Sequence, residues 1–212
     1  MTAIHQGLDR PAAVRRARHL NGVTIGWNVI EGIVAISAGV AAGSLSLVGF
    51  GLDSGIEVSA ALVLTWRLAH EDRDGCQQQA DRRAQRGIAT CFAALAIYVF
   101  TVAVLDLFAG HRPDASTIGI AIAALSLVVM PILARAKRRL ASDLGSRAVE
   151  AEAGQTDLCT MLSAALLVGL GANALFGWWW ADSVTAVAIS LAAATMAVRT
   201  WQADSLEDTC CG

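Results

Sequence analysis

The chain has 212 residues, of which 55% are hydrophobic and only 16% are charged, and its formal net charge is −2 at pH 7. In soluble domains about a quarter of the residues are charged, and nucleic-acid-binding domains usually have a strong excess of basic residues. The composition therefore argues against both classes. The charged residues are concentrated in short stretches between long apolar runs. This pattern is typical of an integral membrane protein.

The N-terminal segment is polar and has no short apolar region followed by a small-residue cleavage site, so we expect no removable signal peptide. After it come six apolar segments, each near the ~20 residues that a helix needs to cross hydrocarbon. The sequence therefore predicts an all-α fold, a six-span transmembrane helical bundle, with spans at 20–41, 44–66, 87–108, 115–134, 149–171 and 182–201. Residues 1–19 are predicted to form a cytoplasmic segment, residues 20–201 the transmembrane domain, and residues 202–212 a short cytoplasmic tail.

The distribution of basic residues gives an independent test of this topology. If the N-terminus lies inside, 15 of the 16 lysine and arginine residues fall on the inner side, and Arg112 falls on the outer side. The positive-inside rule predicts such an imbalance, and an odd number of spans would destroy it. We therefore predict a multi-pass protein of the cell membrane with both termini inside. Trp178, Trp179 and Trp180 are then expected to anchor the outer interface.

Four acidic residues lie well inside the predicted spans, namely Glu31, Asp53, Glu57 and Asp157. A charged side chain at the bilayer centre costs about 2.5–3.5 kcal/mol on insertion scales, so such residues are tolerated when they share protons, pair or bind a cation. From the helical rise, the depths of Glu31, Asp53 and Asp157 below the inner face are roughly 16, 16 and 12 Å. Carboxylates from three spans are therefore expected to converge on one site at the midplane.

The spacing of the polar residues places them on shared helix faces. Asp53 and Glu57 are four residues apart, one turn of a helix, and Asn28 lies three residues before Glu31. Clustered carboxylates repel one another when they are ionised, which favours protonation, and a divalent cation reverses that balance. The same group can thus hold either a metal ion or protons, which is the physical basis of metal/proton exchange.

These residues are similar to those of a known family. The chain resembles the cation diffusion facilitators, also called the cation efflux family, over residues 20–201. The resemblance is carried by Asn28-x-x-Glu31, Gly39-x-x-x-Gly43-Ser44-Leu45, Asp53-x-x-x-Glu57, Asp157 and Trp180-Ala181-Asp182. It implies a homodimeric efflux transporter for Zn²⁺-type cations that works by alternating access and proton antiport.

The resemblance also implies a tetrahedral metal site with two ligands from the second span and two from the fifth. Carried onto this chain, the second-span pair is Asp53 and Glu57. The fifth-span pair is normally His-x-x-x-Asp, and here Asp157 is present while Ala153 stands at the position of the histidine. Imidazole favours zinc-like metals, whereas an all-oxygen site suits harder cations. The metal is therefore open among Zn, Co, Mn and Fe, and an Ala153→His variant would test the assignment.

Several oxygen-bearing side chains are candidates for the missing ligand. They are Gln155, Thr156, Glu31 and Asn28. The family's usual cytoplasmic C-terminal domain has no counterpart after residue 201, so we expect a short branch of the family. Two adjacent thiols in the tail, Cys210 and Cys211, are candidates for capturing a soft metal as thiolates, against the simpler interpretation of unremarkable reduced cysteines.

The sequence therefore predicts a divalent metal cation transporter whose partners are metal ions, protons, lipid and a second copy of the chain. The alternative is a non-transporting metal-binding sensor or regulator in the membrane. An enzyme is not expected, because none of the four histidines lies deep in a span and no nucleophile is paired with a base. We expect no cofactor and no nucleic-acid partner. The expected ligand is the transported divalent cation at the intramembrane site.

Overall fold

The computed structural model describes residues 10–69, 77–110, 112–144 and 147–206, and the regular structure in this part of the chain is helical. The helices are α1 (Arg10–Ala42), α2 (Leu45–Ala69), α3 (Gln77–Ala109), α4 (Thr117–Leu144), α5 (Arg147–Phe176) and α6 (Trp180–Leu206). Each contains a segment that is long and apolar enough to cross a membrane. The predicted all-α, six-span fold is confirmed.

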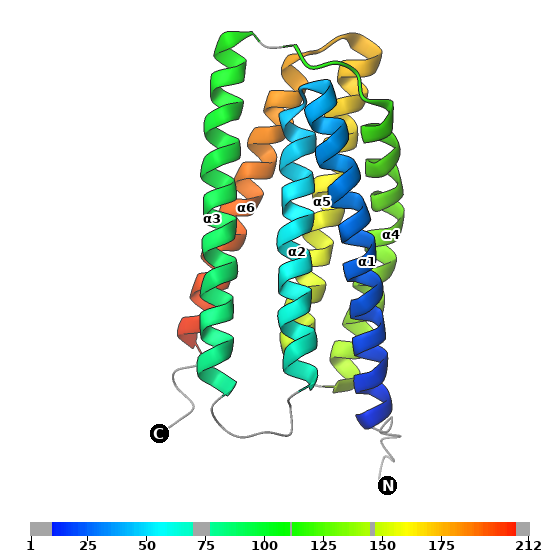
Figure 1. Cartoon of the computed structure of the whole chain (residues 1–212), viewed down its shortest axis with the longest axis vertical. Coiled ribbons are helices and arrows are strands. Elements are labelled where there is room, and N and C mark those ends of the chain that lie inside the picture. The colour runs from blue at the N-terminus through cyan, green and yellow to red at the C-terminus, as the bar shows by residue number, and fades with distance from the viewer. Residues whose placement is uncertain (1–9, 70–76, 111, 145–146, 207–212) are drawn as a thin grey trace, which may run out of the picture.

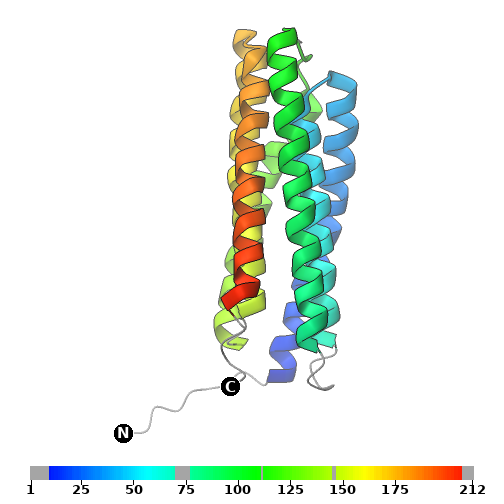
Figure 2. The ribbon, with the colours of Figure 1, turned by 90° about the vertical axis from the view of Figure 1, so that its left-hand side faces the viewer.

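The helices form an elongated bundle in which α3 packs mainly against α6, α1 against α2, and α4 against α5 (Figures 1 and 2). α1 begins and α6 ends at the same end of the bundle, which we call the terminal end. The opposite end, where α1 turns into α2 and α5 into α6, is the loop end. An even number of crossings requires the two ends of the chain to meet on one side. That this side is the cytoplasm stays a prediction.

Several helices continue beyond the predicted spans. α4 runs to Leu144 and α5 begins at Arg147, so most of the expected inner loop at 135–148 is helical. An apolar run marks the depth of the hydrocarbon and not the end of the helix, and lysine and arginine are themselves good helix formers. This extension matters for function, because it carries Lys137 on a helix instead of in a loop.

The surface of the bundle is apolar in the way that lipid requires. Phe108, Leu175 and Val168 are 86%, 79% and 73% exposed, and such large exposed apolar groups are favourable where hydrocarbon covers them. The interior contains Phe50, Met130 and further apolar groups, but it also contains buried serine, threonine and acidic side chains. Polar groups buried between spans mark the part of the bundle where function is expected.

Glycines allow two close helix contacts. A Cβ atom at Gly51 of α2 would lie 2.7 Å from Cγ1 of Ile36 and 3.0 Å from the carbonyl oxygen of Gly32, both on α1. A Cβ atom at Gly169 of α5 would lie 2.1 Å from Oγ1 of Thr185 on α6. Small residues are used in this way where transmembrane helices approach closely, and here they fix the position of α1 against α2 two residues before Asp53.

Asp182 connects the start of α6 to the start of α2 at the loop end. Its carboxylate accepts hydrogen bonds from the hydroxyls of Ser44 (2.6 Å) and Ser46 (2.5 Å) and from the backbone N–H groups of Leu45 (3.0 Å) and Ser46 (3.4 Å). The first N–H groups of a helix have no partner within the helix, and a carboxylate there also interacts favourably with the helix dipole. Asp182 of α6 therefore accepts hydrogen bonds from the first N–H groups of the helix that carries Asp53 and Glu57.

Asp182→Ala is expected to destabilise the folded protein by about 3 kcal/mol, because it leaves two hydroxyls and two N–H groups of a buried helix end without their acceptor. The measurement is the free energy of unfolding in mixed detergent micelles. The matched control is Asp106→Ala in the last turn of α3, which also lies at the loop end. The carboxylate of Asp106 makes no hydrogen bond within the described residues. Equal stability of the two variants would contradict the capping role.

Candidate metal-binding site

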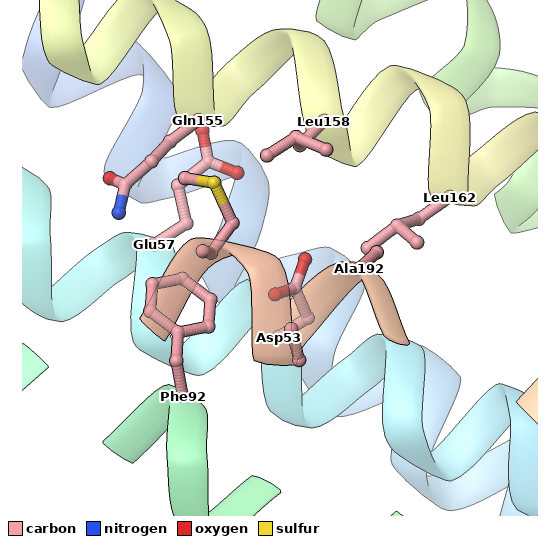
Figure 3. A pocket seen from close by; sticks show the side chains of 9 residues that line it. Asp53, Glu57, Phe92, Gln155, Leu158, Leu162 and Ala192 are labelled. Atoms are coloured by element: carbon pink, nitrogen blue, oxygen red, sulfur yellow. The ribbon is translucent and has the colours of Figure 1, made fainter. Parts of the chain in front are cut away.

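A small pocket lies between α2, α3, α5 and α6 (Figure 3). The side chains of Asp53 and Glu57 point from α2 toward α5. The space open to the centre of a water molecule is about 10 Å³, close to what one water needs. Its lining consists of Asp53 and Glu57 from α2, Phe92 from α3, Gln155, Leu158 and Leu162 from α5, and Ala192, Ala193 and Met196 from α6.

The two α2 carboxylates are held in a largely apolar surrounding. Asp53 is 7% exposed and Glu57 is 3% exposed, and the four-residue spacing puts both on one face of the helix, as predicted. Gln155 reaches the same pocket from α5. The structure thus brings together three of the six residues proposed from the sequence, and their oxygen atoms are ligands that divalent cations accept.

Glu31 lies beside this pocket, on α1, and is fully buried. Its carboxylate accepts hydrogen bonds from Ser54 of α2 at 3.0 Å and from Ser126 of α4. It is also close enough to the carboxylates of Asp53 and Glu57 for charge repulsion between them. Asp53, Glu57 and Glu31 therefore form one buried cluster of carboxylates, which we call the acidic group. The hydroxyl partners of Glu31 also give it a structural role in holding α1, α2 and α4 together.

Asn28, one turn from Glu31, is 1% exposed, and neither polar atom of its side chain has a hydrogen-bond partner among the described residues. Buried amides are nearly always paired with protein groups or ordered water. The structure therefore gives Asn28 a free oxygen and a free amide group in the core of the bundle. It does not bring Asn28 into the lining of the pocket.

Asp157 is not part of the pocket. Its carboxylate forms an ion pair with Arg138 of α4, and its side chain is 31% exposed. Gln155 and Asp157 are two residues apart, which corresponds to about 200° around a helix. The side of α5 that carries Gln155 toward α2 therefore turns Asp157 toward α4. The spacing of residues along the fifth span does not determine the direction in which Asp157 points.

Cys159 of α5 contacts Glu31, beside the pocket. It is 1% exposed, and its Sγ atom lies 3.9 Å from Oε2 of Glu31. Cys159 follows Gln155 by four residues, which is the spacing that the family resemblance implies for the fifth span. The family resemblance places that spacing on Ala153 and Asp157, and so Cys159 was not predicted.

A hydroxyl group and a buried ion pair lie next to Glu57. Thr156 donates a hydrogen bond to Oε1 of Glu57 at 2.7 Å, and Nζ of Lys137 donates to Oγ1 of Thr156 at 3.0 Å. The same Nζ atom lies 3.0 Å from Oε1 of Glu152. Thr156 was predicted as a candidate oxygen ligand, whereas Lys137 was expected in a loop and Glu152 was not predicted to have a role.

In the part of the chain that the structure describes, no three histidine, cysteine, aspartate or glutamate side chains are arranged so that they could hold a metal ion together. The pocket thus offers two carboxylates and an amide from two helices, and not a closed shell of ligands. Metal binding by Asp53, Glu57, Asp157, Glu31, Asn28 and Gln155 stays a prediction. Cys210 and Cys211, the candidate soft-metal ligands of the tail, lie outside the described residues.

The chain matches a known family of membrane proteins. Residues 23–203 fit the family described as the cation efflux transmembrane domain. The curated proteins contain no match to the chain at the level taken as significant. The matched range includes all six described helices in whole or in large part, together with every residue of the pocket.

Proposed function

Because the chain belongs to the cation efflux family, a family of cation transporters and not of enzymes, we propose that this multi-pass integral membrane protein carries divalent metal cations through the pocket between α2 and α5. The observation that supports this assignment is the pair of buried carboxylates, Asp53 and Glu57, facing one water-sized space in the middle of the bundle. Two ionised groups there are costly unless a cation or protons neutralise them.

The donor atoms of the pocket favour a partly hydrated divalent cation. Two carboxylates and the amide of Gln155 supply oxygen ligands, which suit Mn²⁺, Fe²⁺ or Co²⁺. Proton exchange at the same carboxylates, export from the cell and assembly as a homodimer belong to the same proposal. They rest on the chemistry of the acidic group and on the family resemblance.

Transport by the purified protein tests the proposal. Liposomes containing the full chain are expected to move Zn²⁺, Co²⁺, Mn²⁺ or Fe²⁺ in the direction opposed to an imposed proton gradient, measured with a metal-sensitive dye inside the vesicles. Collapse of the gradient with a protonophore should slow the flux. Metal binding without flux would contradict a transporter and would favour the alternative of a membrane metal sensor, and the absence of both would contradict any metal-handling role.

A further inference from the structure

A buried ion pair lies beside the pocket on the side of the terminal end. Lys137 of α4 and Glu152 of α5 are 3.0 Å apart, and their side chains are 3% and 5% exposed. Removing two charges from water is expensive, and such a pair often contributes no more to stability than an apolar pair of the same size. The neighbouring pair of Arg138 and Asp157 is far more exposed, at 57% and 31%. The burial of the Lys137–Glu152 pair is therefore unexplained by helix packing alone.

The ammonium group of Lys137 is separated from the pocket by a single hydroxyl. Its Nζ atom donates to Oγ1 of Thr156 at 3.0 Å, and Thr156 donates to Oε1 of Glu57 at 2.7 Å. α2 runs from the loop end toward the terminal end, so Glu57 is the pocket carboxylate nearer the terminal end. Glu57, Thr156, Lys137 and Glu152 thus form a continuous polar path that leaves the pocket in that direction.

The ammonium group of Lys137 donates hydrogen bonds to oxygen atoms of Glu152 and Thr156. Glu152 supplies a carboxylate, and Thr156 supplies a hydroxyl whose oxygen also lies 3.2 Å from the carbonyl oxygen of Glu152. Carboxylate, hydroxyl and carbonyl oxygens are the ligands that divalent cations accept together with water. In the structure the positive charge in this place is that of Lys137.

We propose that Glu152 and Thr156 form a second cation-binding site between the terminal end and the pocket, which Lys137 occupies as a tethered cation until a divalent cation displaces it. The inference rests on the proposed function, because it gives the transported cation a position before or after the pocket. The ammonium neutralises part of the acidic group when no metal is bound, and its repulsion of a metal ion at Glu57 weakens binding and favours release.

The test compares Lys137→Met with the charge-conserving Lys137→Arg and with Arg138→Met, a matched control on the adjacent residue. Zn²⁺ and Co²⁺ affinities are measured by competition with a chelating dye, and flux is measured in liposomes. Lys137→Met is expected to bind Zn²⁺ about tenfold more tightly, because a like charge a few Å away is removed, and to transport it more slowly. Lys137→Arg and Arg138→Met should stay within about threefold of the wild type.

Glu152→Gln is expected to change the Zn²⁺ affinity in the opposite direction from Lys137→Met. It removes the carboxylate of the second site and frees the ammonium, so Zn²⁺ affinity is expected to fall by about tenfold. A pair that only holds α4 against α5 would instead lower the melting temperature of both variants without opposite shifts in affinity. Affinity changes of the same sign in Lys137→Met and Glu152→Gln, or no change in either, would overturn the inference.

The neutral double variant Lys137→Met/Glu152→Gln covers the case in which a single variant does not fold, since it leaves no unpaired charge. It is expected to fold, to keep the pocket's Zn²⁺ affinity and to transport slowly at low Zn²⁺, and flux equal to the wild type would overturn the second site. A different result would contradict the proposed function itself, namely a wild type that neither binds nor moves Zn²⁺ and Co²⁺. If the wild type does both and Lys137→Met is unchanged, the second site alone is wrong.

Discussion

Liposomes carrying Asp53→Asn are expected to show Zn²⁺ and Co²⁺ flux lower by on the order of 100-fold than the wild type, and Glu57→Gln is expected to behave in the same way. Both substitutions keep the size of the side chain and remove its negative charge. The two carboxylates face one pocket with little access to water, so water molecules cannot compensate for the loss of a negatively charged ligand. Flux is measured with a dye inside the vesicles, and metal binding is measured in detergent.

Asp157→Asn is the informative comparison for this result. In the structure Asp157 pairs with Arg138 and does not line the pocket, so its removal is expected to reduce flux by less than about threefold, as for a partly exposed ion pair. The ligand assignment taken from the family resemblance predicts instead a loss as large as that of Asp53→Asn. Full loss in Asp157→Asn with normal flux in Glu57→Gln would show that α5 is turned differently from the structure described above.

A histidine introduced at Gln155 is expected to raise the affinity for Zn²⁺ by about 10- to 100-fold relative to Mn²⁺, because imidazole binds zinc-like metals better than an amide does. Gln155 lines the pocket beside Asp53 and Glu57, so the new ring would join two carboxylates that already face it. The effect is measured as the ratio of Zn²⁺ to Mn²⁺ affinity and as the ratio of their transport rates.

Ala153→His is the matched variant for this second prediction. Ala153 is fully buried and does not line the pocket, so a histidine there would have to displace neighbouring side chains, and it is expected to destabilise the protein without changing the metal ratio. The alignment of the fifth span with a His-x-x-x-Asp pattern predicts the reverse. A zinc preference in Ala153→His, together with none in Gln155→His, would contradict the position of α5 in the structure.

The six helices could be predicted because two independent features of the sequence agree. The apolar runs give the number of spans, and the one-sided placement of basic residues excludes an odd number. The shared face of Asp53 and Glu57 followed from spacing within a single helix. The structure agrees on these points because each depends on local sequence and on the thickness of the bilayer, and not on how the helices pack.

Gln155 was among the predicted ligands, but which side of α5 faces the pocket could not be predicted in this way. The depth of a residue gives its height along the bundle, but its direction depends on which side of α5 meets α2, and that is decided by packing between helices. Gln155 and Cys159, four residues apart, lie about 40° from each other around the helix, whereas Asp157 lies on the far side. Lys137 was missed for another reason, since a lysine in a basic stretch is normally solvated, and only the extension of α4 to Leu144 places it inside.

The hydrogen bonds that Asp182 makes with the start of α2 also determine how the helix can tilt. They fasten α2 to α6 at Leu45, about 18 Å along the helix axis from Glu57 at 1.5 Å per residue. If α2 tilts as a rigid body, its pivot is therefore at the loop end. A tilt of about 5° about that point would shift the Glu57 carboxylate by about 1.5 Å. Such a tilt would move Glu57 farther than Asp53, which lies closer to Leu45 along α2.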